Sequence, residues 1–159
     1  MSEAQGDAAP FLPQLIGQAF NLVLDGLCHH LAEAGHEDLR PTHCLNVFRL
    51  MDCDGTRPTT LARRAGMTPQ AMSELVGYLE QRGYVRRVPD PADGRGRVVV
   101  YADRGARAAR ISAAYFADME ARWSAAVGPD RLQDVRSALA QILDAAAPHG
   151  GHAPKVPAP

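Results

Sequence analysis

The sequence lacks several features that would each assign it to a defined class of protein. No run of apolar residues approaches the ~18 that cross a bilayer as a helix, so we expect no membrane span. The first ten residues, MSEAQGDAAP, include acidic residues and no basic segment, which argues against a secretory signal. Together these absences predict a cytoplasmic protein.

Cysteine is scarce, and its spacing is uninformative. The three cysteines, Cys28, Cys44 and Cys53, are odd in number and form no C-x-x-C pair, so neither a disulfide framework nor a zinc site is indicated. We interpret them as partly buried, inert thiols. A thiol-based redox sensor is the alternative hypothesis.

Catalytic motifs are also missing. The chain contains no H-E-x-x-H, no phosphate-binding glycine loop and no nucleophile elbow. His29 and His30 are adjacent, so on a helix their side chains point about 100° apart and do not easily face one metal ion. We therefore expect no enzyme activity, no metal and no cofactor.

The net charge of −1 is small, but the charge is unevenly distributed. Between Arg57 and Arg104, nine arginines accompany five acidic residues, a net +4, and the rest of the chain carries −5. A positive centre between acidic ends is typical of a protein that binds a polyanion. A solvated charged surface would have the same composition and remains the alternative.

Both ends of the 159-residue chain show apolar residues at helical spacing. Residues 11–34 carry a wide apolar stripe, wider than one small domain covers. Residues 103–127 repeat apolar side chains at steps of four, Gly128 and Pro129 interrupt the pattern, and residues 132–146 continue it at alternating steps of three and four. We expect these helices to form a homodimer, with disordered tails at 1–10 and 148–159.

The centre of the chain predicts a helix-turn-helix. One helix opens at Pro41 and runs to about Asp52, and a short helix capped by Thr59 or Thr60 ends at Gly66. Thr68 and Pro69 then provide an N-cap and a first-turn proline for a helix to about residue 82. Two helices joined by a short glycine-containing turn are typical of the helix-turn-helix motif.

A β-hairpin follows this motif. Residues 84–88 and 98–101 are rich in valine and read as strands, and residues 89–94 form a turn. The tip carries Arg95 and Arg97, with Gly94 and Gly96 on either side of Arg95. The predicted fold is therefore mostly α with a small β-hairpin wing. A winged helix-turn-helix lobe at 41–102 is flanked by dimerisation helices at 11–35 and 103–147, all within one domain of residues 11–147.

The helix that starts at Pro69 separates into two faces, and the polar one suits DNA. Gln70 has the geometry to pair with adenine in the major groove, and Ser73 can reach a base edge or a phosphate. Arg63 and Arg64, on the preceding helix, are placed for phosphate contacts. Arg86 and Arg87 alternate along a strand, so one of them faces DNA. The complete set of candidate DNA-binding residues is Arg57, Thr59, Arg63, Arg64, Thr68, Gln70, Ser73, Tyr78, Arg86, Arg95 and Arg97.

The run GTRPTTLARRAGMTPQAMSELVGYLEQRGYVRRVPDPADGRGRVVVYADRG resembles the MarR family of bacterial regulators. Asp93-x-Arg95 and Gly105 have the spacing of that family's wing, and the matching segment covers about a third of the chain. The resemblance implies a symmetric dimer on a pseudo-palindromic operator in double-stranded DNA, with Arg95 in the minor groove. Because phosphates repel a carboxylate, we expect Asp93 to orient Arg95 by a charge-assisted hydrogen bond rather than to contact DNA. Two residues depart from the pattern. Ala102 replaces a capping Thr, whose role Asp103 is expected to take, and Glu74 stands where a basic residue is common.

The resemblance also implies a small aromatic or anionic effector that binds between the dimer helices and the DNA-binding lobe. The candidate lining residues are His30, His43, Phe48 and Arg49, and simple packing or solvation is the alternative for each. The predicted function is a sequence-specific, ligand-responsive transcriptional regulator, with repression as the expected direction. A thiol sensor and a protein-interaction module without DNA affinity are the alternatives.

Overall fold

The computed structural model describes residues 9–146, which form two compact units divided between Pro41 and Thr42. The first unit contains α1 (Leu12–Leu31), followed by a turn (Ala32–His36) that kinks at Gly35, where φ is 84°. The helix predicted at 11–34 is thus confirmed, with α1 itself ending at Leu31. The tails predicted at 1–10 and 148–159 lie outside the described residues, apart from residues 9 and 10.

The boundary between the units falls at the first residue of α2 (Pro41–Asn46), and a 3₁₀ turn (Phe48–Leu50) follows in the second unit. The single helix predicted to reach Asp52 is therefore too long. Val47 is fully buried and has φ −118°, outside the helical range, so the chain tightens there into a 3₁₀ turn closed by Leu50 N–H on the Val47 carbonyl at 3.0 Å.

The helix-turn-helix consists of α3 (Pro58–Ala65) and α4 (Pro69–Gln81). The N-cap of α3 is Arg57 rather than the predicted Thr59 or Thr60, because Pro58 occupies the first helical position, where its missing N–H leaves nothing unpaired. Gly66 ends α3 in the left-handed region at φ 64°. The predicted cap of α4 is confirmed, since Thr68 Oγ1 accepts a hydrogen bond from Ala71 N–H at 3.2 Å.

The wing is an antiparallel hairpin of β1 (Val85–Pro89) and β2 (Arg97–Tyr101), paired from Val85 with Tyr101 to Pro89 with Arg97. Each strand differs from its predicted range by one residue. Thr56 adds a bridge on the other side of β2, exchanging two backbone hydrogen bonds with Val99 at 3.0 and 2.9 Å. The bridge joins the loop before α3 to the hairpin, which the sequence did not predict.

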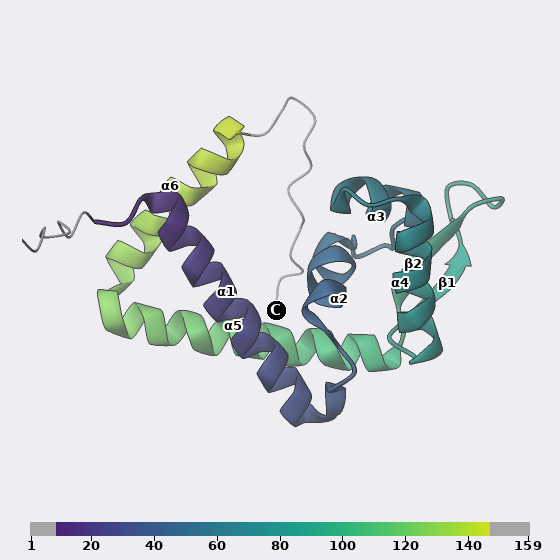
Figure 1. Ribbon diagram of the computed structural model, residues 1–159, viewed down its shortest axis with the longest axis horizontal. Coiled ribbons are helices and arrows are strands. Elements are labelled where there is room, and N and C mark those ends of the chain that lie inside the picture. Colours follow the sequence, from purple (N-terminus) through teal and green to yellow (C-terminus); the bar gives the residue numbers. More distant parts are fainter. Residues whose placement is uncertain (1–8, 147–159) are drawn as a thin grey trace, which may run out of the picture. The chain divides into compact units, whose positions relative to one another are not determined.

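The long helix α5 (Asp103–Val127) is followed by α6 (Pro129–Ala146). Figure 1 shows α3, α4 and the hairpin gathered near the start of α5, with α6 leaving from its other end. Asp103 does not take over as a side-chain cap: the N-cap is Ala102, whose N–H donates to the Tyr84 carbonyl at 3.0 Å. Gly105 lies so close to that carbonyl that a Cβ would come within 2.0 Å of its oxygen.

The core of the second unit lies under the helix-turn-helix and the hairpin. Its fully buried side chains are Val47, Leu61, Met72, Val76, Leu79, Tyr84, Val85 and Val99. Burial of each large apolar side chain contributes about 1.5–3 kcal/mol, so α3, α4 and the hairpin form one packed lobe. A mostly helical chain with one two-stranded sheet in its described part confirms the predicted fold class. None of the described helices combines the length and apolar character needed to cross a bilayer.

Candidate nucleic-acid interface

The two faces of α4 differ sharply in exposure. Met72, Val76 and Leu79 are fully buried, whereas the polar side chains on the outer face, Gln70, Ser73 and Glu74, are exposed. A 3.5 Å contact joins Gln70 Nε2 to Glu74 Oε1, which is at the limit of a hydrogen bond. The outer face therefore presents an amide, a hydroxyl and a carboxylate that can each meet an external hydrogen-bonding partner.

The two arginines of α3 have different surroundings. Arg63 is exposed, as a phosphate contact requires. Arg64 turns inward: its Nη1 donates to the Leu50 carbonyl at 2.7 Å and lies 2.9 Å from Asp52 Oδ2. Asp52 also binds Thr56, whose Oγ1 accepts from the Asp52 N–H at 2.8 Å. Arg64 therefore links α3 to the preceding loop, and its expected phosphate contact stays a prediction.

Arg57, another candidate DNA contact, forms ion pairs within the protein. Its Nε donates to Asp90 Oδ2 at 2.6 Å, and its Nη2 lies 3.4 Å from Asp93 Oδ2. The Ala92 N–H and the Arg57 guanidinium hold the pKa of Asp90 below its ordinary value, and the same ion pair raises the pKa of Arg57. Sequence reasoning missed Asp90; its place before a proline in a turn was the available signal.

The wing tip presents its arginines to solvent. Arg95 and Arg97 are exposed, and Asp93 Oδ1 accepts a hydrogen bond from the Arg95 backbone N–H at 3.2 Å. Asp93 thus fixes the backbone at Arg95, while the other carboxylate oxygen faces Arg57 rather than the Arg95 guanidinium.

The adjacent arginines of β1 point in different directions, as strand alternation predicts. Arg86 is exposed. Arg87 is half-buried and forms an ion pair with Glu80 of α4, and its backbone N–H donates to Glu80 Oε1 at 3.1 Å. Arg86 is therefore the strand arginine available to an external anion, and Arg87 connects the wing to α4. Thr59, another candidate contact, is exposed on the first turn of α3.

Tyr78 of α4 is half-buried in an aromatic cluster. Its ring stacks on His43 of α2 with centroids 4.6 Å apart, and the Arg82 guanidinium carbon lies 3.6 Å from its centroid. These contacts place Tyr78, a candidate DNA contact, against His43, a candidate effector residue. The two predictions therefore converge on one cluster between α2 and α4.

Two of the other effector candidates, Phe48 and Arg49, have contacts of their own. Phe48 stacks on Tyr101 with centroids 5.7 Å apart, and Arg49 is exposed with its Nε 3.4 Å from the Leu45 carbonyl. His30 is exposed on α1, in the other unit. A shallow cavity of about 340 Å³ lies between α5 and α6, lined by Ala117, Glu120, Ala121, Ser124, Pro129, Leu132, Gln133 and Arg136.

The three cysteines differ in exposure: Cys44 is buried, Cys28 is half-buried and Cys53 is exposed. The expectation of partial burial is therefore wrong for Cys53, which sits in the loop between the 3₁₀ turn and α3. Burial, with smaller effects of Cys53 and Cys44, raises the pKa of Tyr101 to about 12. Tyr101 is thus a neutral neighbour of both thiols at physiological pH.

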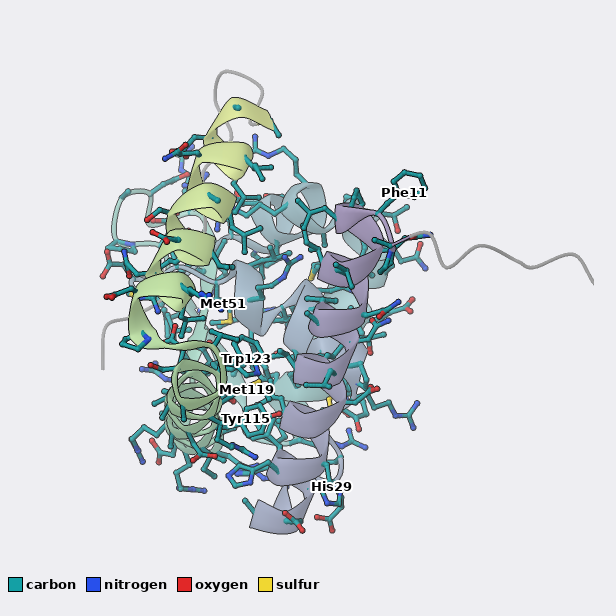
Figure 2. The ribbon with its side chains drawn as sticks, turned by 90° about the vertical axis from the view of Figure 1, so that its left-hand side faces the viewer. Phe11, His29, Met51, Tyr115, Met119 and Trp123 are labelled. Atoms are coloured by element: carbon teal, nitrogen blue, oxygen red, sulfur yellow. The ribbon has the colours of Figure 1, made fainter. Side chains whose placement is uncertain are left out.

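Large exposed apolar side chains occur only in the terminal helices of the described chain. They are Phe11, Leu12, Leu15, Ile16, Phe20 and Leu22 at α1, Phe116, Trp123 and Val127 in α5, and Val135, Ile142 and Leu143 in α6. Figure 2 shows Tyr115, Met119 and Trp123 following one another along α5, where the first two are buried and Trp123 is exposed. Phe11, at the start of α1, is 77% exposed. Surfaces of this kind mark contacts with other molecules.

Comparison with known proteins agrees with this geometry. Residues 45–96 match the sequence pattern of the MarR family, so the match covers α3, α4 and most of the wing. No curated protein sequence matches the chain.

Several solved structures share the fold. One is a MarR-family transcriptional regulator from Rhodococcus sp. RHA1, with 23% identity, a TM-score of 0.60 and coverage of 89% of this chain and 97% of that one. CouR from Rhodococcus jostii RHA1, solved bound to p-coumaroyl-CoA, has 24% identity, a TM-score of 0.61 and coverage of 89% and 95%. Wild-type MarR from E. coli has 18% identity, a TM-score of 0.66 and coverage of 86% and 99%. The predicted resemblance is confirmed.

Proposed function

We propose that this chain, which resembles the MarR family in its central sequence and its fold, is a sequence-specific regulator of transcription that binds double-stranded DNA as a homodimer. The observation that carries the proposal is the two-sided α4. Met72, Val76 and Leu79 on its apolar face are fully buried, and its outer face offers Gln70 and Ser73 to an external partner. A helix held in this way can enter the major groove, where these side chains match base edges.

The exposed arginines support the same function. Arg63 on α3, Arg86 on β1 and Arg95 and Arg97 at the wing tip are all solvent-exposed. Phosphate contacts from such residues provide affinity that does not depend on sequence, and a tip arginine suits the narrow minor groove. The exposed apolar side chains of α1, α5 and α6 supply the surface for a second copy of the chain.

Selection of bound fragments from a genomic library with purified protein tests this function. We expect enrichment of a pseudo-palindromic site, with log affinity that falls linearly as log salt rises. Retention on DNA that is equal for every fragment would contradict sequence specificity. A protein with no salt-dependent retention would instead be an interaction module.

We also propose that the protein represses transcription. In this proposal a small aromatic or anionic effector weakens its binding to DNA and so relieves repression. CouR, one of the similar structures, was solved with p-coumaroyl-CoA, a ligand that is both aromatic and anionic. A ligand changes DNA affinity only if it binds the two conformations of the protein unequally.

The effector proposal is tested by thermal shift and gel shift with aromatic carboxylates, phenols and aromatic acyl-CoA esters. Free coenzyme A is the control for the nucleotide part alone. A ligand that raises the melting temperature and releases DNA supports the proposal. Release by a thiol oxidant, abolished by Cys53→Ser, would favour the redox alternative, since Cys53 is the exposed thiol.

A further inference from the structure

Arg57 lies at a junction between two parts of the lobe. Its backbone provides the N-cap position of α3, and its side chain reaches residues 33 and 36 positions later, in the turn of the wing. Asp90 Oδ2 accepts from Arg57 Nε at 2.6 Å, and Asp93 Oδ2 lies 3.4 Å from Arg57 Nη2. Two different nitrogens of one planar group therefore hold two carboxylates of one turn.

Asp90 is the buried member of this arrangement. Its side chain is only 8% exposed, and its second oxygen accepts from the Ala92 N–H at 2.8 Å. A buried carboxylate is stable when its oxygens are hydrogen-bonded and a cation is close. The Arg57 guanidinium therefore supplies the charge that allows Asp90 to remain inside the turn.

The same turn sets the backbone of the wing tip. The Asp90 N–H donates to the Gly96 carbonyl at 3.0 Å, and the Gly96 N–H donates to the Asp93 carbonyl at 2.8 Å. A Cβ on Gly96 would lie 3.4 Å from Asp90 Cβ and 3.5 Å from Arg57 Nη2, so the tip packs directly against the ion pair. Arg95 and its neighbours are thus built on the two aspartates that Arg57 holds.

The N-cap position of α3 lacks a capping side chain, because it is occupied by Arg57. Ser, Thr, Asp or Asn at an N-cap would accept a hydrogen bond from the first turn of α3, and the helix has no side-chain cap here. The side-chain hydrogen bonds of Arg57 go to Asp90 and Asp93 of the wing turn and not to α3. The arginine is therefore better suited to the wing than to α3.

We propose that Arg57, Asp90 and Asp93 form a clamp that fixes the wing against the helix-turn-helix, and that Arg57 is a positioning residue rather than a DNA contact. The effect of the clamp on DNA binding rests on the proposed function, but the clamp itself is a property of the free protein. Its role is to hold the wing tip, with Arg95, in a fixed position relative to the helix-turn-helix.

Limited digestion of the full chain with trypsin, without DNA, tests the clamp, because Arg95 and Arg97 are themselves cleavage sites. We expect Arg57→Thr and Asp90→Asn each to accelerate cleavage after these two residues by about tenfold, since the tip opens more often. Arg63→Thr, which removes an exposed arginine from the same helix, is the matched control and should leave the wing rate unchanged. Threonine can cap α3 and so offsets part of the stability lost with the ion pair, and for this reason the wing cleavage rate, rather than the melting temperature, is the measured quantity.

Wing cleavage in Arg57→Thr at the wild-type rate would overturn the clamp. If Arg57→Thr fails to fold, Arg57→Lys replaces it: lysine keeps the charge but lacks the planar pair of donors, so the clamp predicts faster cleavage.

DNA affinity separates positioning from direct contact. Asp90→Asn removes a negative charge, which by simple electrostatics strengthens binding to DNA, whereas the clamp predicts about tenfold weaker binding. We expect the double variant, Arg57→Thr with Asp90→Asn, to lose no more affinity than either single variant, because each of the three proteins lacks the same ion pair. Weaker binding in Arg57→Thr with unchanged or tighter binding in Asp90→Asn would overturn the positioning role. If neither the wild type nor any variant binds DNA, the proposed function is wrong. The digestion experiment, which uses no DNA, still shows whether the clamp exists.

Discussion

Arginine residues of the same lobe differ in what surrounds their guanidinium groups. Arg63 and Arg86 are exposed, Arg64 bonds to Leu50 and Asp52, and Arg87 pairs with Glu80. Their spacing in the sequence does not distinguish them, because the partners are up to 14 positions away and are brought close only by folding. The sequence thus predicted a basic lobe, but it did not show which of its arginines have partners within the protein.

Replacing the two arginines of α3 separates these roles. Arg63→Ala should weaken binding to all DNA sequences alike and reduce the salt slope by about 1, with unchanged folding. Arg64→Ala should lower the free energy of unfolding by about 1–2 kcal/mol, because a half-buried charged hydrogen bond is lost. Urea unfolding and binding titrations over a salt series measure both effects. The assignment is wrong if Arg64→Ala is as stable as the wild type.

Gln70 is the sharpest candidate for reading a base. Gln70→Ala should weaken binding to the selected site by about 1–3 kcal/mol and relax the preference at one position. Its effect on random DNA should be small, because an exposed amide contributes little to phosphate contacts. Equal losses on both kinds of DNA would show that Gln70 positions the protein instead.

The Asp90 carboxylate makes a pH-dependent contribution to stability. Hydrogen bonds from Ala92 and Arg57 hold its folded pKa below the ordinary value of 3.8, so its stabilising effect is fully present above pH 3.8 and is lost as pH falls toward the folded pKa. The difference in melting temperature between wild type and Asp90→Asn should therefore be constant from about pH 5 to 7 and shrink below about pH 4. A difference that grows on acidification would contradict the sign of this shift.

At the scale of helices and strands, local signals predicted the elements well where one residue fixes a boundary. Thr68 and Pro69 start α4, Gly66 ends α3, and α5 covers the predicted 103–127. Predictions failed where tertiary contacts decide. The bridge between Thr56 and Val99 joins residues 43 positions apart, and the buried Val47 breaks the helix predicted through it. No local pattern reports such pairings.

Gly105 shows how α5 and the wing depend on close approach. Because a Cβ at this position would lie 2.0 Å from the Tyr84 carbonyl oxygen, Gly105→Ala should shift the start of α5 and destabilise the fold by roughly 2–3 kcal/mol. Gly77→Ala is the matched control: a Cβ added there would meet nothing within 4 Å, and alanine favours the helix by up to about 1 kcal/mol. Thermal unfolding of both variants checks the opposite signs.

The wing tip is expected to read the minor groove. Arg95→Ala should weaken binding and reduce the preference for A·T-rich flanks, which narrow the groove and raise its negative potential. Arg95→Lys should restore binding only in part, because a hydrated ammonium group enters the groove less readily than a guanidinium group. Wild-type affinity of Arg95→Ala on every flank would exclude this role.

At the scale of the whole molecule, the large exposed apolar side chains of the described chain belong to α1 with the preceding Phe11, to α5 and to α6, while α3, α4 and the hairpin form a well-packed lobe. We expect a stable dimer at micromolar concentration in light scattering. Val135→Glu combined with Ile142→Glu should shift the protein toward monomer, since a charge would be buried in the apolar contact. Ser137→Glu, exposed on another side of α6, is the control. A folded wild-type monomer would contradict the predicted dimer.

The clamp at Arg57 has a calorimetric consequence. A wing that is already ordered in the free protein loses little conformational freedom when it meets DNA, whereas a released wing must be ordered at that moment. Titration calorimetry should therefore give a less unfavourable binding entropy and a smaller heat-capacity change for wild type than for Arg57→Thr. Asp90 and Asp93 are therefore expected to affect how DNA binding varies with temperature, although their carboxylates do not contact DNA in this proposal.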